Sequence, residues 1–257
     1  MSDKTLSRRD LLKVAGATAA TAIGLRVVKK ANASEAVSNE NGRKWAMIID
    51  QNVCTGCGYC VLACRAHNDV SPDITWNPIL EAEPIGDTKV YLPRPCMQCE
   101  DAPCVEVCPV KASYYRPDGI VMMDYDRCIG CRYCQVACPY GARSFNWDAF
   151  TGANPAVPEW GEPEVDRRPR GVPEKCSFCY QRIDRGLELG LTPGVDNDAT
   201  PACVVACPTG TRMFGDVNDP ESNVSKALHE QYTYRLREDL GTEPRVYYIP
   251  AVPKKEA

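Results

Sequence analysis

Residues 128–139 read CIGCRYCQVACP, a run in which four cysteines are spaced C-x2-C-x2-C-x3-C and are followed by proline. Residues 54–64 (CTGCGYCVLAC) repeat this spacing, although Arg65 stands where the proline would be. Residues 96–109 widen the middle gap of the pattern by two residues. A fourth group is split by 23 intervening residues and consists of Cys176, Cys179, Cys203 and Cys207. These four groups use all 16 cysteines of the 257-residue chain.

The spacing within each group is typical of iron–sulfur ligands. Three thiolates in a tight loop can reach three corners of one [4Fe–4S] cube, and a fourth cysteine after a short helical turn points to a second cube. Gly56, Gly58 and Gly130 let the backbone approach sulfur and leave amide N–H groups free to donate to it. The four groups therefore predict four [4Fe–4S] clusters.

Two other uses of the cysteines fit the pattern less well. Structural zinc sites combine paired C-x2-C units, and these four groups do not divide naturally into such pairs. Disulfide scaffolds are usually far shorter than the 224 residues that follow residue 33. Lys111 and Lys175 lie beside the second and fourth groups, where each would either offset cluster charge or be solvated.

The exchange of the last cysteine between groups predicts which thiols share a cluster. The second and third groups are adjacent and form one unit, so they exchange Cys108 and Cys138. The first and fourth groups are then left to exchange Cys64 and Cys207. The predicted sites are site 1 (Cys54, Cys57, Cys60, Cys207), site 2 (Cys96, Cys99, Cys104, Cys138), site 3 (Cys128, Cys131, Cys134, Cys108) and site 4 (Cys176, Cys179, Cys203, Cys64).

The first 33 residues predict an export signal. Residues 7–13 (SRRDLLK) match the twin-arginine signal, and the 12 uncharged residues that follow are fewer than the roughly 20 of a spanning helix. Ala31-Asn32-Ala33 fits a cleavage site, and cleavage there and retention as an anchor are both compatible with the segment. Because the twin-arginine route carries folded, cofactor-loaded proteins, we expect a periplasmic protein whose thiols need not be disulfides.

Charge and composition exclude several functions. The first 33 residues contain seven Lys or Arg and two Asp or Glu, whereas the remaining 224 contain 23 and 32. This acidic body argues against a nucleic-acid-binding protein, which would present a basic face. Two histidines, His67 and His229, are too few for a His-ligated zinc enzyme or a multihaem protein. No glycine-rich dinucleotide loop or histidine–carboxylate constellation indicates a substrate site, so no catalytic residue is predicted.

The patterns between the cysteine groups predict an α+β fold. We expect strands at residues 45–50, 89–92 and 212–215, a hairpin around the turn 117–119 within residues 113–124, and helices at 180–191 and 220–229, the latter starting at Pro220. The architecture expected is two interleaved bacterial-ferredoxin-like units with extended loops. The predicted divisions are a signal peptide (1–33), one unit (34–95 with 171–216), a second unit (96–150), a Pro-rich connection (151–170) and a C-terminal tail (217–257).

Residues 44–249 resemble the four-cluster iron–sulfur subunits of the dimethyl sulfoxide reductase family. This family includes the B chains of polysulfide, thiosulfate and tetrathionate reductases and the nitrite reductase iron–sulfur protein. The segments that carry the resemblance are 128–134 (CIGCRYC), 137–143 (ACPYGAR), 174–179 (EKCSFC) and 201–216. The start at Trp45 and the ending at 241–248 also resemble the periplasmic iron–sulfur subunit of the Dsr membrane complex. The resemblance implies the same interleaving of one ferredoxin unit within another.

The expected function is therefore electron transfer by a non-catalytic subunit. The resemblance implies two partners, an integral membrane subunit that reacts with quinone and a catalytic, molybdopterin-containing or other redox subunit. The alternative is a freestanding periplasmic polyferredoxin that meets its partners transiently. Residues 151–173 and 217–257 favour the subunit, because extended segments without a core of their own usually lie on another protein.

Overall fold

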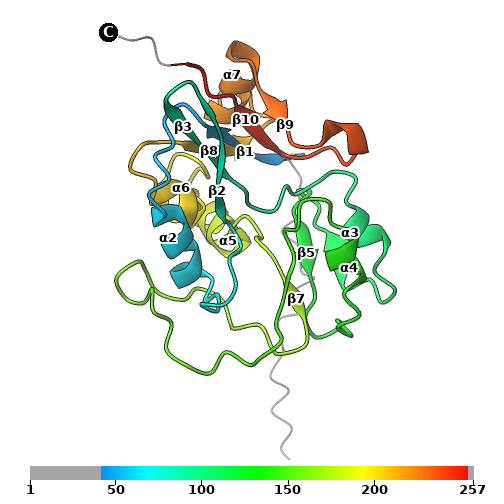
Figure 1. The fold of residues 1–257 in the computed structure, drawn as a ribbon. Helices are drawn as coiled ribbons and strands as arrows, with labels where there is room; N and C mark the ends of the chain where they lie inside the picture. The colour runs from blue at the N-terminus through cyan, green and yellow to red at the C-terminus, as the bar shows by residue number, and fades with distance from the viewer. Residues whose placement is uncertain (1–41, 254–257) are drawn as a thin grey trace, which may run out of the picture. The chain divides into compact units, whose positions relative to one another are not determined.

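The computed structural model describes residues 42–253, so the predicted signal segment lies outside the described residues. A four-stranded sheet has the order β8-β1-β10-β9 (Figure 1). β1 (Trp45–Asp50) pairs antiparallel with β8 (Arg212–Asp216) and parallel with β10 (Val246–Ile249), while β9 (Tyr234–Arg235) lies at the edge beside β10. The strands predicted at residues 45–50 and 212–215 are confirmed.

Both faces of β1 are buried, which is why its sequence is continuously apolar up to Asp50. Side chains alternate between the two faces of a strand. Trp45, Met47 and Ile49 join the main core, which contains most of the buried cysteines. Ala46 and Ile48 face the opposite way and pack against α7 (Asn223–Glu230). β1 is thus the element that anchors the cysteine-rich core to the rest of the fold.

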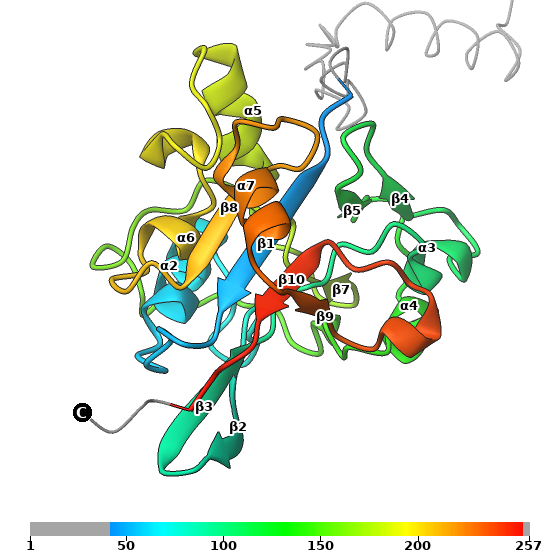
Figure 2. The same ribbon diagram turned by 90° about the horizontal axis from the view of Figure 1, so that it is seen from above.

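α7 covers the face of the sheet that points away from the cysteine-rich core (Figure 2). The expected start of this helix at Pro220 is wrong, because the helix begins after Ser222. The Ser222 hydroxyl oxygen accepts a hydrogen bond from the backbone N–H of Ser225 at 3.0 Å. A side-chain oxygen that satisfies a free amide of the first turn is a stronger start signal than a nearby proline.

Three hairpins or short strand pairs surround the cysteine groups. β4 (Ser113–Tyr115) and β5 (Val121–Met123) form the predicted hairpin, and Gly119, at φ +78°, closes its turn. The predicted strand at residues 89–92 lies within β3 (Thr88–Pro93), which pairs with β2 (Ile79–Ile85). β6 (Ser144–Phe145) pairs with β7 (Pro173–Glu174).

Each cysteine group ends on a short helix that carries its third cysteine. These helices are α2 (Tyr59–His67), α3 (Pro103–Glu106), α4 (Tyr133–Val136) and α6 (Ala202–Val205). α2 of the first group packs against α6 of the fourth, and α3 of the second packs against α4 of the third. The helix expected at residues 180–191 is confirmed as α5 (Tyr180–Glu188), and two 3-10 turns, η1 (Asn197–Ala199) and η2 (Glu238–Leu240), lie in the loops.

The two segments expected to lie on another protein instead pack on the chain itself. In the tail, Val246 and Tyr248 of β10 are fully buried, and β10 lies between β1 and β9. In the Pro-rich connection, Arg167 Nε is 2.6 Å from Asp69 Oδ2 and Asn154 Nδ2 is 2.9 Å from Asp69 Oδ1. These segments therefore do not support a partner protein in the way that the sequence suggested. Strand pairing holds the tail within this chain's own core, and polar contacts hold the Pro-rich connection on its surface.

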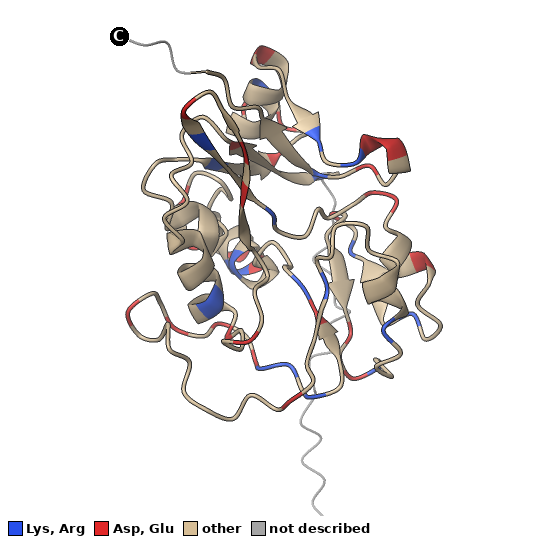
Figure 3. Cartoon of the chain, in the orientation of Figure 1, with Lys and Arg blue, Asp and Glu red and all other residues tan. Residues whose placement is uncertain are grey.

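In the view of Figure 3, the Lys and Arg positions are interspersed with the Asp and Glu positions along the described chain. Within residues 42–253, no helix is both long enough and apolar enough to cross a membrane.

Candidate iron–sulfur centres

The structure gathers the cysteines around separate cavities. One cavity is lined by Cys54, Cys57, Cys60 and Cys207. A second is lined by Cys96, Cys99, Cys104 and Cys138, and a third by Cys64, Cys176, Cys179 and Cys203. For the remaining four thiols, the charges of Cys108 and Cys131 act on Cys128, and those of Cys104, Cys128 and Cys108 act on Cys134. The three cavities thus bring together the thiols named above as sites 1, 2 and 4, and the grouping of the other four as site 3 stays a prediction.

The thiols are free, and backbone amides point at several of them. Gly130 N–H donates to Cys128 Sγ at 3.4 Å, Phe178 N–H to Cys176 Sγ at 3.5 Å, and Ala112 N–H to Cys108 Sγ at 3.1 Å. Amides that donate to thiolate sulfur orient metal ligands and tune the redox potential of an iron–sulfur centre. In the described residues, no group of three or more Cys, His, Asp or Glu is arranged around a point that could hold a single metal ion.

Unpartnered donors at site 4 also fit a sulfur-rich group. Trp76 and Asn77 line the same cavity as Cys64. Trp76 Nε1 and Asn77 Nδ2 are buried and have no hydrogen-bond partner among the described residues. Because a buried donor left unpaired costs about 1–3 kcal/mol, these atoms favour an acceptor in the cavity. The inorganic sulfides of a cube would supply such acceptors.

A left-handed residue stands just before the second cysteine in all four groups. Gly56 and Gly130 both have φ +71°, a conformation that glycine adopts without strain. Gln98 and Phe178 hold the equivalent positions at φ +47° and +56°, although neither is glycine. The only sequence signal for a left-handed backbone at these two residues is their position, one residue before the second cysteine of the group.

Gln98 and Phe178 compensate for their strained backbone with buried contacts to residues far away in the sequence. The Gln98 side chain donates to the carbonyl oxygen of Cys176 at 2.7 Å and accepts from Val121 N–H at 2.8 Å. Phe178 packs edge-on against Phe214, with ring centroids 5.4 Å apart. Both residues therefore join the second and fourth cysteine groups to the same core.

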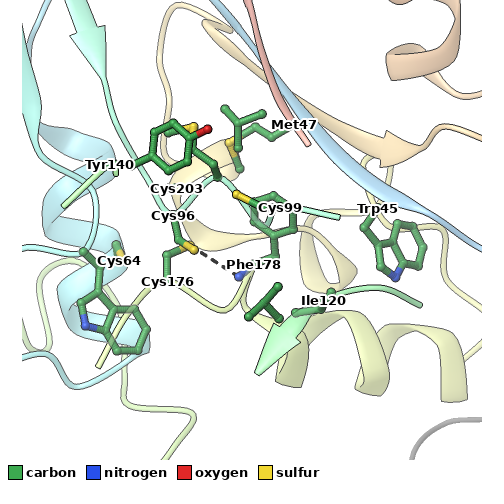
Figure 4. Packing of buried hydrophobic residues seen from close by; sticks show 14 of the residues in the cluster. Trp45, Met47, Cys64, Cys96, Cys99, Ile120, Tyr140, Cys176, Phe178 and Cys203 are labelled. Carbon is green, nitrogen blue, oxygen red and sulfur yellow. Dashed lines mark hydrogen bonds between the residues drawn. The ribbon is translucent and has the colours of Figure 1, made fainter. Parts of the chain in front are cut away.

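Sites 4 and 2 are neighbours. Figure 4 shows Cys96 beside Cys176 in the buried core. Burial, followed by the charge of Cys96, raises the pKa of the Cys176 thiol to about 12. Since Cys96 belongs to site 2 and Cys176 to site 4, the two predicted units meet at these sites. At the other ends, Cys57 of site 1 and Cys131 of site 3 are exposed.

Sequence reasoning missed two buried arginines beside the thiols. Arg143 Nη2 donates to Cys104 Sγ at 3.1 Å. Arg212 Nη2 lies 3.7 Å from Cys60 Sγ, and its Nη1 lies 3.9 Å from Cys203 Sγ. The sequence did contain a signal, because each arginine stands five residues after the last cysteine of its group, Cys138 or Cys207.

The fold and these thiol sets define a ferredoxin-type protein, and comparison with known families agrees. The family model for a 4Fe-4S dicluster domain matches residues 88–153, and a second model of that description matches residues 127–211. A model for a 4Fe-4S binding domain matches residues 45–66. The α+β ferredoxin-type fold and the binding of iron–sulfur clusters are thereby confirmed.

Similar proteins narrow the family further. The chain is 44% identical over 230 residues to the menaquinone reductase iron–sulfur cluster-binding subunit of Nitratidesulfovibrio vulgaris, covering 80% of this chain and 88% of that protein. It is 36% identical over 241 residues to the arsenate respiratory reductase iron–sulfur subunit of Shewanella sp. strain ANA-3 (82% and 98% covered). It is 38% identical over 214 residues to the B chain of polysulfide reductase from Wolinella succinogenes (81% and 95% covered). The chain belongs to the family of iron–sulfur electron-transfer subunits of dimethyl sulfoxide reductase-type complexes.

Proposed function

We propose that the chain binds four [4Fe–4S] clusters at sites 1 to 4 and carries electrons through them in the order 1, 4, 2, 3. The observation that carries this proposal is the contact between the cysteine sets. Sites 1 and 4 share Arg212, and Cys176 of site 4 neighbours Cys96 of site 2. The helices that carry the third cysteines of sites 2 and 3, α3 and α4, pack together. When bound, each cluster would supply a one-electron redox centre.

The two ends of this order are the places where electrons would enter and leave. Cys57 of site 1 and Cys131 of site 3 are exposed, whereas the four thiols of site 4 are buried. We propose that an integral membrane, quinone-reactive subunit docks at one end and a catalytic or other redox subunit at the other. The similar proteins are named as parts of menaquinone, arsenate and polysulfide reductases, which supports this kind of assembly. In this proposal the chain itself carries no catalytic residue.

We also propose a periplasmic location, based on the twin-arginine pattern at residues 7–13. A folded chain that receives its clusters in a reducing cytoplasm needs an export route that accepts folded proteins. Association with the membrane would then come through the partner subunits.

The cluster content is tested by anaerobic purification and chemical analysis. Four cubes predict about 16 iron atoms and as many acid-labile sulfides per chain, with visible absorption that dithionite bleaches. Stoichiometric zinc without sulfide would contradict the proposal.

The assembly is tested by gentle membrane solubilisation from the native cell, followed by affinity purification of this chain. A subunit should remain with the membrane fraction and retain stoichiometric partners, including one integral membrane protein. A polyferredoxin would be recovered alone from the soluble periplasmic fraction, and that result would replace the subunit assignment.

A further inference from the structure

Arg212 lies between sites 1 and 4. Its Nη2 is 3.7 Å from Cys60 Sγ of site 1, and its Nη1 is 3.9 Å from Cys203 Sγ of site 4. The side chain comes from β8, and its Nη2 also donates to Asn77 Oδ1 at 2.7 Å. Arg212 is buried, so water does not screen its charge from either set of thiols.

Arg143 occupies the equivalent place between sites 2 and 3. Its Nη2 is 3.1 Å from Cys104 Sγ of site 2, and it also lines the cavity of that site. Cys104 lies on α3, which packs against α4, the helix that carries Cys134 of site 3. The buried guanidinium beside Cys104 therefore lies at the boundary between sites 2 and 3.

Lys175 lies in the remaining gap, between sites 4 and 2. Its Nζ donates to the carbonyl oxygen of Cys176 at 2.9 Å and also to that of Val121. Cys176 is a thiol of site 4, and Val121 lines the cavity of site 2. Lys175 is buried at 2% exposure, so it is not one of the solvated lysines. Lys111, the other lysine considered beside the cysteines, is exposed.

The contacts of these three residues distinguish them from the other buried cations. The other buried cations have carboxylate partners, since Arg168 pairs with Glu174, Arg182 with Glu164 and Arg245 with Glu100. The hydrogen-bond partners of Arg143, Lys175 and Arg212 are sulfur atoms and amide or carbonyl oxygens, and within residues 42–253 no carboxylate is among them. A buried charge without an opposite charge is strongly unfavourable. We therefore expect the negative charge that balances these three cations to lie on the thiol sites themselves.

We propose that Arg212, Lys175 and Arg143 each lie between two successive clusters, and we call them gap cations. Each gap cation raises the reduction potentials of the two clusters beside it, so that the potentials along the chain become more similar. The proposal rests on the four-cluster function proposed above. Reduction of a cluster adds one negative charge without making or breaking a bond. A fixed cation between two clusters stabilises the reduced form of both and offsets the repulsion between electrons on neighbouring clusters. The respiratory partners supply and remove these electrons.

The test is a set of charge-removing and charge-keeping substitutions in the full chain with its clusters. Arg143→Gln, Arg212→Gln and Lys175→Met remove the gap cations, whereas Arg143→Lys, Arg212→Lys and Lys175→Arg keep the charge. Lys111→Gln is the matched control, because it removes a cation near Cys108 that water screens. Each variant is analysed for iron and sulfide and titrated potentiometrically with electron paramagnetic resonance detection.

Each charge-removing variant should lower the potentials of its own two flanking sites and leave the other two unchanged. The expected change is at least tenfold in each reduction equilibrium, or about 59 mV for one electron. Charge-keeping variants should restore most of this change, which a purely structural role would not predict, and Lys111→Gln should have little effect. Unchanged potentials in charge-removing variants that retain full iron would overturn the proposal.

If a glutamine variant does not retain its clusters, the comparison of Lys175→Met with Lys175→Arg tests the proposal. These variants are less disruptive, because Lys175 contacts carbonyl oxygens rather than thiol sulfur. Equal potentials in Lys175→Met and Lys175→Arg would then overturn the proposal. Failure of the underlying function is distinguishable, since it would appear as fewer than four clusters in the unsubstituted chain, whatever the potentials of the variants.

Discussion

The side-chain amide of Asn68 donates to Cys179 Sγ at 3.5 Å, although 111 residues separate the two in sequence. The same Nδ2 donates to the carbonyl oxygen of Cys64 at 3.0 Å and lies 3.8 Å from Cys64 Sγ. The end of α2, which belongs to the first cysteine group, therefore lies against the fourth group. The contact lies where Cys64 lines one cavity with Cys176, Cys179 and Cys203, whereas Cys54, Cys57 and Cys60 line another.

Replacing Cys64 with alanine should damage site 4 and leave site 1 intact. The variant should lose up to one cube, so iron should fall from about 16 to about 12 per chain, and the paramagnetic signal of a single cluster should disappear. Cys57→Ala is the control, because Cys57 lines the cavity with Cys54, Cys60 and Cys207. Double variants separate the sites, since Cys64→Ala with Cys203→Ala should lose no more iron than either alone. Additive losses would show that Cys64 and Cys203 serve different clusters.

Gly130→Ala should destabilise the site 3 loop. A Cβ at residue 130 would lie 2.3 Å from the carbonyl oxygen of Gly171, and the residue has φ +71°. Strain of this kind costs about 1–3 kcal/mol, so anaerobic thermal unfolding should begin at a lower temperature. Gly58→Ala is the control for backbone strain alone, because Gly58 has φ +83° but nothing within 4 Å of its Cβ position. Equal losses in the two variants would show that the approach of Gly171 is unimportant.

Glu164→Gln should weaken the attachment of the Pro-rich connection to the body. Glu164 Oε1 lies 3.0 Å from His67 Nδ1 and 2.6 Å from Arg182 Nη1. Burial would raise the pKa of Glu164, but the hydrogen bond with His67 and the charges of Arg182 and Arg185 lower it to about 2. A carboxyl whose pKa is lowered on folding stabilises the folded state above its unfolded pKa, and that stability is lost as the pH falls.

The difference in unfolding free energy between unsubstituted protein and Glu164→Gln should therefore be constant above about pH 4.5 and should shrink as the pH falls towards 2. Anaerobic unfolding measured at a series of pH values, together with proteolysis of residues 151–173, gives both quantities. Exposed Glu162→Gln serves as the control and should show neither effect. A difference that grows on acidification would contradict the assignment of the ion pair.

Substituting Lys for both Arg8 and Arg9 should stop export. The receptor of the twin-arginine route reads the guanidinium pair rather than charge alone, so cluster-loaded precursor should accumulate in the cytoplasm. Fractionation followed by immunoblotting and iron analysis measures this. Lys4→Arg is the control, because it alters a basic residue outside the motif. Normal export of the double variant would show that the motif is incidental.

The sequence alone determined the local parts of this protein. The cysteine spacing predicted the iron–sulfur chemistry, which family models confirm. The apolar run at residues 45–50 and the turn at 117–119 predicted β1 and the β4–β5 hairpin. These features succeed because a ligand loop, a strand and a tight turn depend on residues within about ten positions of one another.

Only the tertiary structure decided the parts that depend on distant residues. Val246–Ile249 becomes an inner strand because it pairs with β1, about 200 positions earlier, and no local pattern distinguishes an inner strand from an extended tail. Gln98 and Phe178 adopt left-handed backbone because buried contacts with distant residues, Cys176 for Gln98 and Phe214 for Phe178, offset the strain. Arg143 and Arg212 resemble surface arginines in sequence, and they become buried cations because the fold encloses them among thiols from separate cysteine groups.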